Sequence, residues 1–360
     1  MPNQQHHYDY LIIGQGLAGS VLALHLLAKN KRIRVIDNDH ASSSSMVAAG
    51  MITPLAGRRL AKSWKIDEAL PYARTFYQQC ESFTQGPCFF ARTIHRLMKN
   101  QEEALRLKKR IHDPRYTPYL GEVRAPLTLQ HTHADTLGSV DILQAGYLAV
   151  SDFLIATRAH FQQQKCYAAT SFEHAELELH TAGVRYQTIT ADTVIFCEGW
   201  QGQRNPWFNW LPFNSAKGDI LTLETPDKTI RNVYNQRKWV LPLENNQLKV
   251  GATYTRESLD CIPQASARAE LLTAFQTLLP NIRDYQIVHH QAGVRPLTID
   301  NHPFIGRHPQ HPQLAIFNGF GSKGSLFIPL LADHFTHHLE HQAALWTAAN
   351  INRHWPPKSA

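Results

Sequence analysis

The hydrophobic pattern of the first forty residues predicts a β-α-β unit. Residues 10–13 form a short apolar run, residues 18–28 repeat apolar side chains at helical spacing, and residues 33–36 form a second apolar run. Short apolar runs on either side of an amphipathic segment are typical of parallel strands joined by a helix. The chain is therefore expected to open with two strands of a parallel sheet and the helix that connects them.

Farther along, helical patterns alternate with short strand patterns. Residues 113–127 contain three prolines and predict a turn-rich connection. Residues 193–197 are fully apolar and end at a glycine, which suits a buried parallel strand that returns to the first sheet. Helices are predicted at residues 66–83, 101–111, 146–164 and 326–339. Other strands are predicted at residues 217–223, 238–243, 247–253 and 314–317, with several short ones in 166–187.

This order predicts an α/β fold with two interleaved domains, and the length of 360 residues fits that number. A cofactor is expected to stretch along the boundary between them. The Rossmann-like nucleotide-binding domain is expected from residues 1–65, 145–205 and 285–345. The α+β substrate domain, built on an antiparallel sheet, is expected from residues 66–144 and 206–284, with a C-terminal tail at 346–360.

Three glycines join the first predicted strand to the first helix. Gly14, Gly16 and Gly19 have the dinucleotide-binding spacing G-x-G-x-x-G. The first permits a tight turn, the second lets the backbone approach a pyrophosphate, and the third lets helix and strand pack closely. Free N–H groups at the helix start attract phosphate. Asp37 ends the second strand, where an acid that hydrogen-bonds an adenosine ribose is expected, so the motif predicts a dinucleotide cofactor.

A segment of small residues follows the second strand. Residues 38–57 read NDHASSSSMVAAGMITPLAG, and small side chains let backbone amides close on a ligand. The alternative is a flexible serine-rich linker, but the apolar end of the segment favours an ordered one. Arg58, Arg59 and Lys62 come next and are candidates for phosphate or substrate contacts, with a solvated surface as the alternative.

A second glycine pattern lies in the last third of the chain. Gly319, Gly321 and Gly324 follow the apolar run 314–317, which alone would suggest a second nucleotide-binding domain. No further strand with a ribose-binding acid follows the next helix, so this pattern cannot complete another β-α-β unit. We interpret it as a glycine-bracketed helix start directed at another electron-rich group.

Composition and charge narrow the class of protein. With 43% hydrophobic and 18% charged residues, the sequence predicts a globular protein. It has no signal-peptide pattern, and no apolar run approaches the ~20 residues of a membrane span. The five cysteines are widely spaced and predict reduced thiols and not a disulfide framework, which favours a cytoplasmic protein. The 21 histidines are scattered and do not predict a metal site. The net charge of +7 allows an anionic partner without identifying one, and residues 106–110 (RLKKR) predict a solvated helix face.

These segments together resemble the D-amino-acid oxidase superfamily of flavoproteins, most closely its glycine-oxidase-like branch. DYLIIGQGLAGS…RVID resembles the FAD-binding start, SSSSMVAAGMITPLAG the small-residue loop beneath the flavin, and ADTVIFCEGW the later strand and turn. KWVLPLENNQLKVGATYT resembles the substrate-domain hairpin. GVRPLTIDNHPFIGRHP with LAIFNGFGSKGS resembles the C-terminal signature, the most specific of these blocks. The resemblance covers nearly the whole chain.

The resemblance implies FAD that is bound non-covalently, because no cysteine occupies the C-terminal signature. It implies oxidation of a C–N bond in an amino acid or secondary amine. Hydride would pass to flavin N5, the imine would hydrolyse afterwards, and oxygen or another acceptor would reoxidise the flavin. The residues expected to bind FAD are Gly14, Gly16, Leu17, Ala18, Gly19, Asp37, Asn38, Ser44, Ser45, Ala48, Ala49, Gly50, Met51, Phe172, Gly199, Gly319, Gly321, Ser322, Lys323, Gly324 and Ser325.

Three residues are expected to act on the substrate or the flavin. The resemblance assigns Arg295, in a GxRP signature, to the substrate carboxylate, which a guanidinium can meet with two parallel hydrogen bonds. The alternative for this arginine is an ion pair with Asp300. Lys323 would stabilise the reduced flavin, or would be a solvated loop lysine, and it stands where the branch usually has arginine. Trp239 stands where the branch usually has tyrosine, so glycine is not assigned as the substrate.

Two other functions stay open. A flavin domain of this superfamily acts on a modified uridine in tRNA and shares the glycine-serine-basic-glycine run found here at residues 321–324. The methyltransferase domain fused to it in that system is not found in these 360 residues. The other alternative is a non-enzymatic scaffold that binds flavin without turnover.

Overall fold

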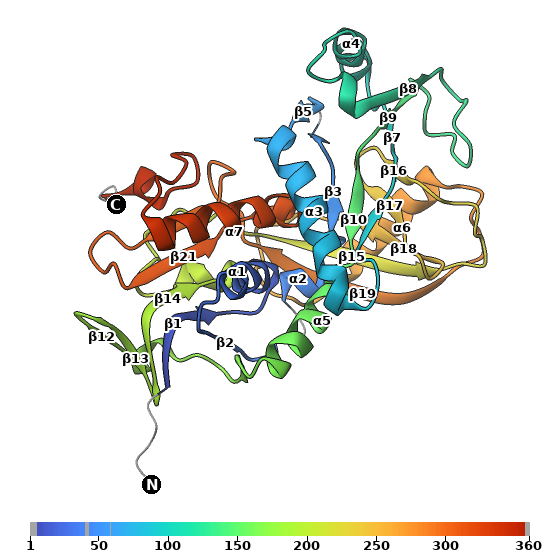
Figure 1. The fold of residues 1–360 in the computed structure, drawn as a ribbon. Helices are drawn as coiled ribbons and strands as arrows, with labels where there is room; N and C mark the ends of the chain where they lie inside the picture. Colours follow the sequence, from blue (N-terminus) through green and yellow to red (C-terminus); the bar gives the residue numbers. More distant parts are fainter. Residues whose placement is uncertain (1–5, 40–42, 58, 357–360) are drawn as a thin grey trace.

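The computed structural model describes residues 6–39, 43–57 and 59–356 and has an α/β fold with two large sheets (Figure 1). A mainly parallel sheet forms one half of the molecule, and a mainly antiparallel sheet forms the other. The strands of each sheet come from separate segments of the chain, so the backbone passes between the halves several times. The expected Rossmann-like sheet interleaved with an antiparallel sheet is confirmed.

The first sheet has the order β11-β2-β1-β14, and β13 and β21 both pair with the other side of β14. Along β1, Tyr10 and Ile12 belong to one core, whereas Leu11 and Ile13 belong to another. Both faces of the sheet are therefore covered, which explains its continuous apolar runs. The strands are β1 (His6–Ile13), β2 (Ile33–Asp37), β11 (Tyr167–Ala169), β12 (Leu177–His180), β13 (Gly183–Tyr186), β14 (Ile189–Phe196), β20 (Phe304–Arg307) and β21 (Leu314–Asn318).

Helices cover one face of this sheet. α1 lies between the first strands, α5 and α7, so it is apolar on nearly every side, and α3 packs against α5 and α7. None of the helices in the described part of the chain is long and apolar enough to cross a membrane. These helices are α1 (Leu17–Ala28), α3 (Ile66–Thr84), α5 (Val150–Gln163) and α7 (Gly324–His341).

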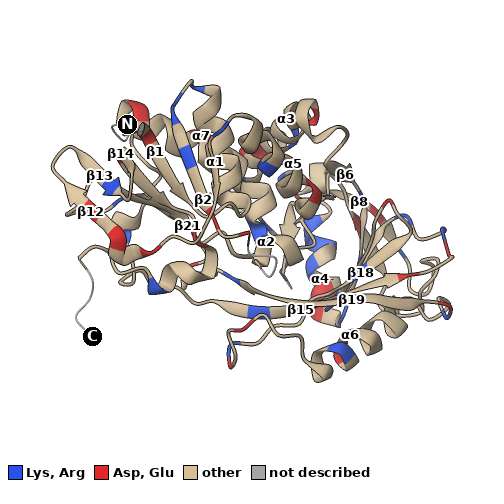
Figure 2. Ribbon diagram, turned by 90° about the horizontal axis from the view of Figure 1, so that it is seen from below, with Lys and Arg blue, Asp and Glu red and all other residues tan. Residues whose placement is uncertain are grey.

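The second sheet has the order β19-β15-β18-β17-β16-β7-β9-β8, and α6 packs on it through a third core. Its strands are β7 (Ile94–Leu97), β8 (Leu120–Arg124), β9 (Ser139–Ile142), β15 (Ala216–Glu224), β16 (Val233–Asn235), β17 (Trp239–Pro242), β18 (Gln247–Gly251) and β19 (Gln286–Arg295). The remaining elements are α2 (Ser44–Val47), α4 (Gln101–Arg110), α6 (Ala265–Leu278), β3 (Met51–Ile52), β4 (Leu55–Ala56), β5 (Ala61–Lys62), β6 (Phe89–Ala91) and β10 (Gly146–Leu148). Seen from below, β15 and β19 pass beside α2 between the two halves (Figure 2).

Four expectations need correction. Residues 146–148 form β10, not the start of a helix, because they pair with β3 and β6. The connection 113–127 contains β8, which pairs with β9. The expected C-terminal tail packs on the fold over residues 346–356, since Ile351 is fully buried and Asn350 bridges to the first sheet at Ile305. β19 belongs to the antiparallel sheet, although the expected boundary gave residues 285–345 to the nucleotide-binding half.

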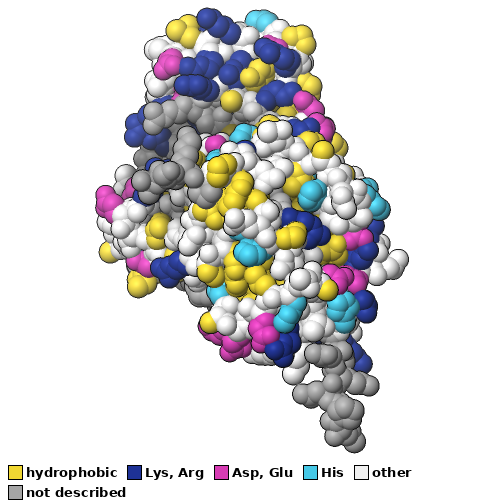
Figure 3. Space-filling model, turned by 90° about the vertical axis from the view of Figure 1, so that its left-hand side faces the viewer, with side chains coloured by type: hydrophobic (Ala, Val, Ile, Leu, Met, Phe, Trp, Pro, Cys, Tyr) yellow, Lys and Arg dark blue, Asp and Glu magenta, His cyan; other side chains and the backbone are white. Residues whose placement is uncertain are grey.

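The basic run 106–110 lies on α4, at the tip of the molecule farthest from the first sheet (Figure 1). Lys108 and Lys109 are exposed, and Arg106 pairs with Glu102 on the same helix. Figure 3 shows Lys and Arg side chains gathered at this end, whereas Figure 2 shows both signs of charge over both halves. The run is a solvated helix face, as its sequence predicts.

Candidate functional site

A cavity of about 530 Å³ lies between the two sheets. Ile13, Ile36 and Cys197 line it from one side, at the carboxyl ends of three parallel strands. Gly218 and Arg295 line it from the antiparallel sheet. Ligands of open α/β sheets bind outside the carboxyl ends of the strands, so this cavity is the candidate active site.

The first glycine motif forms one wall of the cavity. Gly14 has a φ of +98°, which L side chains rarely adopt, and a Cβ there would lie 2.6 Å from the carbonyl oxygen of Cys197. Gly16 is the N-cap of α1 and lines the cavity. Gly19 does not line it, because it faces the strand, where a Cβ would overlap the carbonyl oxygen of Gly14. The tight turn at Gly14 and the close packing at Gly19 agree with the spacing, and the approach of a pyrophosphate to Gly16 stays a prediction.

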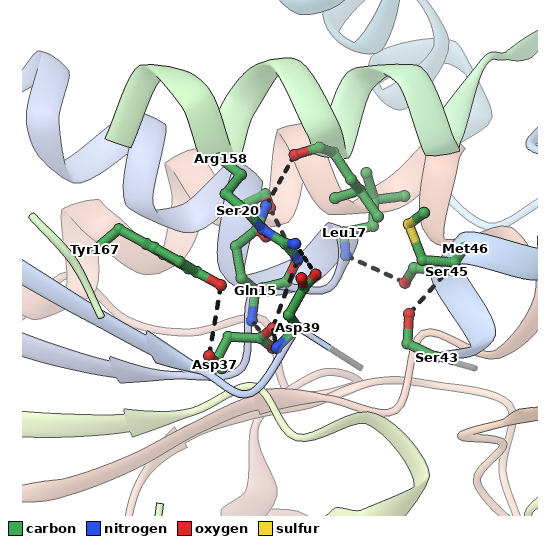
Figure 4. A network of polar contacts seen from close by, with 11 residues as sticks. Gln15, Leu17, Ser20, Asp37, Asp39, Ser43, Ser45, Met46, Arg158 and Tyr167 are labelled. Atoms are coloured by element: carbon green, nitrogen blue, oxygen red, sulfur yellow. Dashed lines mark hydrogen bonds and ion pairs between the residues drawn. The ribbon is translucent and has the colours of Figure 1, made fainter. Parts of the chain in front are cut away.

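Asp37 lies at the end of β2 and is held by the backbone around it (Figure 4). Its Oδ2 accepts a hydrogen bond of 2.8 Å from the N–H of Gln15, inside the glycine motif, and its Oδ1 accepts one of 2.9 Å from the N–H of Asp39. The carboxylate thereby links the turn after β1 to the turn after β2. Asp37 and Asn38 both line the cavity.

Arg158 on α5 ties these two turns together, and no sequence motif had indicated it. Its Nε donates to Oε1 of Gln15 at 2.8 Å, Nη1 pairs with Asp39, and Nη2 lies 3.7 Å from Oδ1 of Asp37 (Figure 4). The guanidinium also lies 5.5 Å from the ring centre of Tyr167. Arg158 therefore balances the negative charge of two neighbouring carboxylates beside the glycine turn that is expected to bind phosphate.

Replacing Arg158 with methionine is expected to weaken FAD binding by about tenfold or more. Hydrogen bonds to charged groups contribute roughly 1.5–3 kcal/mol, and without the guanidinium two carboxylates would repel the cofactor phosphates. Fluorescence titration of apo-protein with FAD measures the change. Arg185→Met is the matched control, because Arg185 pairs with Glu178 on an exposed hairpin. An unchanged FAD dissociation constant in Arg158→Met would refute this role.

The small-residue segment contains α2, β3 and β4, so its described part is an ordered segment and not a linker. Residues 40–42 of the segment lie outside the described part of the chain. Ser43 caps α2, and Gly50 has a φ of +67° that fits its turn. Lys249 on β18 donates to the carbonyl oxygen of Ala48 at 3.2 Å and fixes the segment from the second sheet. Burial lowers the pKa of this lysine. The predicted residues that line the cavity here are Ser44, Ser45, Ala48, Ala49, Gly50 and Met51.

The far end of the cavity holds Phe172, Gly199 and an ion pair that sequence reasoning missed. Nε2 of His174 lies 2.7 Å from Oε1 of Glu198, and the other carboxylate oxygen accepts from Asn205 at 2.8 Å. The hydrogen bond to Glu198 raises the pKa of His174. The pair forms where the turn after β14 meets the segment after β11, so no local motif could indicate it.

The His174–Glu198 pair predicts a pH dependence of stability. Because the pKa of His174 is raised in the folded state, its contribution is complete below the unfolded value of about 6.5 and is lost as pH rises through the folded value. The difference in Tm between the wild type and His174→Gln should shrink from about pH 6 to about pH 9. Thermal unfolding followed by circular dichroism measures it. A difference that does not change with pH would contradict the prediction.

The second glycine pattern reaches the cavity only in part. Gly321, Ser322, Gly324 and Ser325 line it, whereas Gly319 packs against Thr298 and Phe304 outside it. Lys323 does not line the cavity either. Its Nζ lies 3.3 Å from Oγ of Ser63, and burial lowers its pKa. The lysine is therefore neither in the cavity nor at a solvated loop tip.

The part of the cavity formed by the second sheet contains Arg295 and Trp239, the two residues expected to act on the substrate. The guanidinium of Arg295 is half-buried, and its Nη1 and Nη2 lie 3.4 and 3.5 Å from the carbonyl oxygen of Thr253. Burial lowers its pKa. The alternative ion pair with Asp300 is wrong, because that carboxylate pairs with Arg353 at 2.8 Å.

The other basic candidates do not reach the cavity in the part of the chain that is described. Arg59 is exposed and does not line it, and Lys62 pairs with Asp67 at 2.7 Å. Arg58 lies outside the described residues. Among the Lys and Arg residues that the structure describes, Arg295 is thus the one that lines the cavity.

Comparisons with known proteins identify the family of this chain. The sequence profile of the family described as FAD dependent oxidoreductase matches residues 9–338. Glycine oxidase of Bacillus subtilis is 23% identical over 90% of this chain and 91% of its own. The crystal structure of glycine oxidase from Geobacillus kaustophilus has a TM-score of 0.82 at 20% identity, covering 94% of this chain and 96% of its own. Iminodiacetate oxidase from Chelativorans sp. BNC1 has a TM-score of 0.79 at 20% identity, covering 97% and 100%. With its glycine motif, its cavity and this match over most of its length, the chain belongs to the family of FAD-dependent oxidoreductases.

Proposed function

We propose that this enzyme oxidises a C–N bond of an amino acid, or of a secondary amine that carries a carboxylate. Arg295 carries the proposal, because its half-buried guanidinium lines the cavity with no carboxylate partner among the described residues. A desolvated cation without a counter-ion is unfavourable, so a ligand carboxylate would stabilise it. The relatives named glycine oxidase and iminodiacetate oxidase support this substrate class.

The cavity residues fit FAD. The turn at Gly14 and Gly16 admits a pyrophosphate that a Cβ would exclude, Asp37 suits a ribose hydroxyl, and the helix start at Gly324 suits an electron-rich ring. When bound, FAD supplies the acceptor for the hydride and its two electrons. The chain itself orients the substrate through Arg295 and excludes water with apolar side chains such as Ile220.

The test is anaerobic bleaching of the flavin absorbance with amino acids, N-substituted amino acids and amines without a carboxylate. Bleaching by carboxylate-bearing amines is the expected result. Bleaching only by amines without a carboxylate would refute the anchor, and no bleaching by any amine would favour the non-enzymatic scaffold. Oxygen uptake compared with dye reduction then identifies the electron acceptor.

The location of the protein and its mode of FAD binding belong to the same proposal. The five cysteines are all free thiols, and four are buried, which supports a cytoplasmic protein. Non-covalent FAD is proposed because the C-terminal signature contains no cysteine. We also propose two domains that meet at the cavity, with residues 286–295 in the substrate domain.

We propose that the positive charge of Lys323 stabilises the reduced flavin electrostatically and without direct contact. Its neighbours Ser322 and Gly324 line the cavity, whereas Lys323 itself does not. Lys323→Met is expected to lower the flavin reduction potential and to weaken sulfite binding, since both depend on stabilised negative charge. Potentiometric titration and sulfite titration measure these effects. Ser63→Ala is the control that removes the neighbouring hydroxyl and keeps the charge. Unchanged potential and sulfite affinity in Lys323→Met would rule the role out.

A further inference from the structure

Gly218 lies directly beneath the guanidinium of Arg295. A Cβ at position 218 would be no more than 2.6 Å from Nη1, Nη2 and Cζ of Arg295. Because these three atoms are this close, the Nη1–Nη2 end of the guanidinium lies against the backbone of β15 at Gly218. Arg295 pairs with Ala216 across the β15–β19 ladder, so Gly218 is its diagonal neighbour.

A second contact lies at the Nη1–Nη2 end of the guanidinium. The carbonyl oxygen of Thr253 lies 3.4 and 3.5 Å from Nη1 and Nη2. Thr253 is held by Asp219, whose N–H donates to its Oγ1 at 2.8 Å and whose carbonyl oxygen accepts its N–H at 3.2 Å. Strand side chains alternate between faces, so Asp219 lies on the far side of β15 from Gly218 and the cavity. Its carboxylate pairs there with His290 at 2.9 Å.

We propose that Gly218 is a specificity-determining residue of the carboxylate subsite, an inference that rests on the proposed function. Its missing side chain lets the Arg295 guanidinium occupy the space that a Cβ would fill, and this sets where the guanidinium lies in the cavity wall. Glycine within a strand is otherwise unfavourable and often marks a close approach of another group. Here the three nearest atoms to a Cβ all belong to Arg295.

Gly251 on β18 provides a matched comparison beside the same cavity. A Cβ at position 251 would overlap the ring of Trp239, which also lines the cavity. Gly251 pairs with Ile220, so the two glycines lie on neighbouring strands. Alanine at position 251 displaces an indole, whereas alanine at position 218 displaces a guanidinium.

The experiment compares acetate with acetamide, which have similar shapes but different charge, by titrating each into the holoenzyme and following the flavin spectrum. Gly218→Ala is expected to weaken acetate about tenfold or more and to change acetamide by less than about twofold. Gly251→Ala is expected to shift both ligands together. The same selective loss of acetate in Gly251→Ala, or equal loss of both ligands in Gly218→Ala, would overturn the proposal.

Arg295→Ala and the double variant separate this inference from the proposed function. If Arg295→Ala leaves acetate affinity unchanged, both the carboxylate anchor and the role of Gly218 fail. If it weakens acetate but Gly218→Ala does not, or if the two penalties add in the double variant, only the role of Gly218 fails. Should Gly218→Ala lose its flavin, recovery of FAD in the double variant supports the inference, because the new methyl then meets no guanidinium. Failure to recover overturns it.

Discussion

Arg295→Ala is expected to lower kcat/KM for a carboxylate-bearing amine by about 30-fold or more while FAD content stays unchanged. Loss of a desolvated, charge-assisted contact costs roughly 2–5 kcal/mol. The half-buried position of Arg295, its lowered pKa and its place on the cavity wall all indicate that such a contact would be desolvated. Steady-state kinetics and the flavin-to-protein absorbance ratio measure the two quantities.

Two further variants test whether the loss of activity is due to the guanidinium of Arg295. Arg295→Lys keeps the charge but loses the planar fork, so KM should rise more than kcat falls. Arg353→Lys is the matched control, because Arg353 pairs with Asp300 and does not line the cavity. Near-normal acetate affinity in Arg295→Ala, with flavin and fold intact, would place the anchor elsewhere.

The sequence predicts the nucleotide-binding half well because its signals are local. The apolar runs, the helical spacing and the three glycines lie within thirty residues, and α1 begins at Leu17, one residue before its predicted start. Residues 193–196 of the predicted run 193–197 likewise lie in β14, which pairs in parallel with β1. These predictions depend on periods and turns that each segment shows by itself.

The residues and strands that the sequence did not predict depend on contacts between distant segments of the chain. Arg158 lies more than a hundred residues after Asp37, and only the packing of α5 on the first sheet brings them together. His174 and Glu198 are also distant in the sequence, and they meet only because the turn after β14 lies beside the segment after β11. β10 is three residues long, too short to show a period of two, and only its pairing with β3 and β6 defines it as a strand.

The direction in which a side chain points was the other feature that the sequence could not predict. The glycine pattern correctly indicated a helix start that borders the cavity, yet Lys323 within it points to Ser63. Nothing in the run Gly321–Lys323 distinguishes a lysine that enters the cavity from one that packs behind it. Conversely, Gly218 has no motif of its own, and its closeness to Arg295 depends on the register of β15 and β19.

Gly16→Val is expected to yield apo-protein. Gly16 is the N-cap of α1, lines the cavity, and has φ −68° and ψ −174°, an extended conformation that valine adopts without strain. A Cβ there would already lie 3.2 Å from Oγ of Ser45, so the two methyl groups of valine would extend into the space for the pyrophosphate. The fold should therefore persist while the cofactor is excluded.

The flavin-to-protein absorbance ratio after purification measures this loss, and circular dichroism reports whether the fold is kept. The ratio is expected to fall at least about tenfold, because blocking the backbone removes the phosphate contacts at the helix start together. Ala28→Val is the matched control: it puts valine at the exposed end of the same helix, far from the glycine turn, and should keep its flavin. Stoichiometric FAD in Gly16→Val would mean that the pyrophosphate does not approach this backbone. The phosphate-binding role would then have to move to another segment of the cavity wall, of which Ser44 and Ser45 are the nearest candidates.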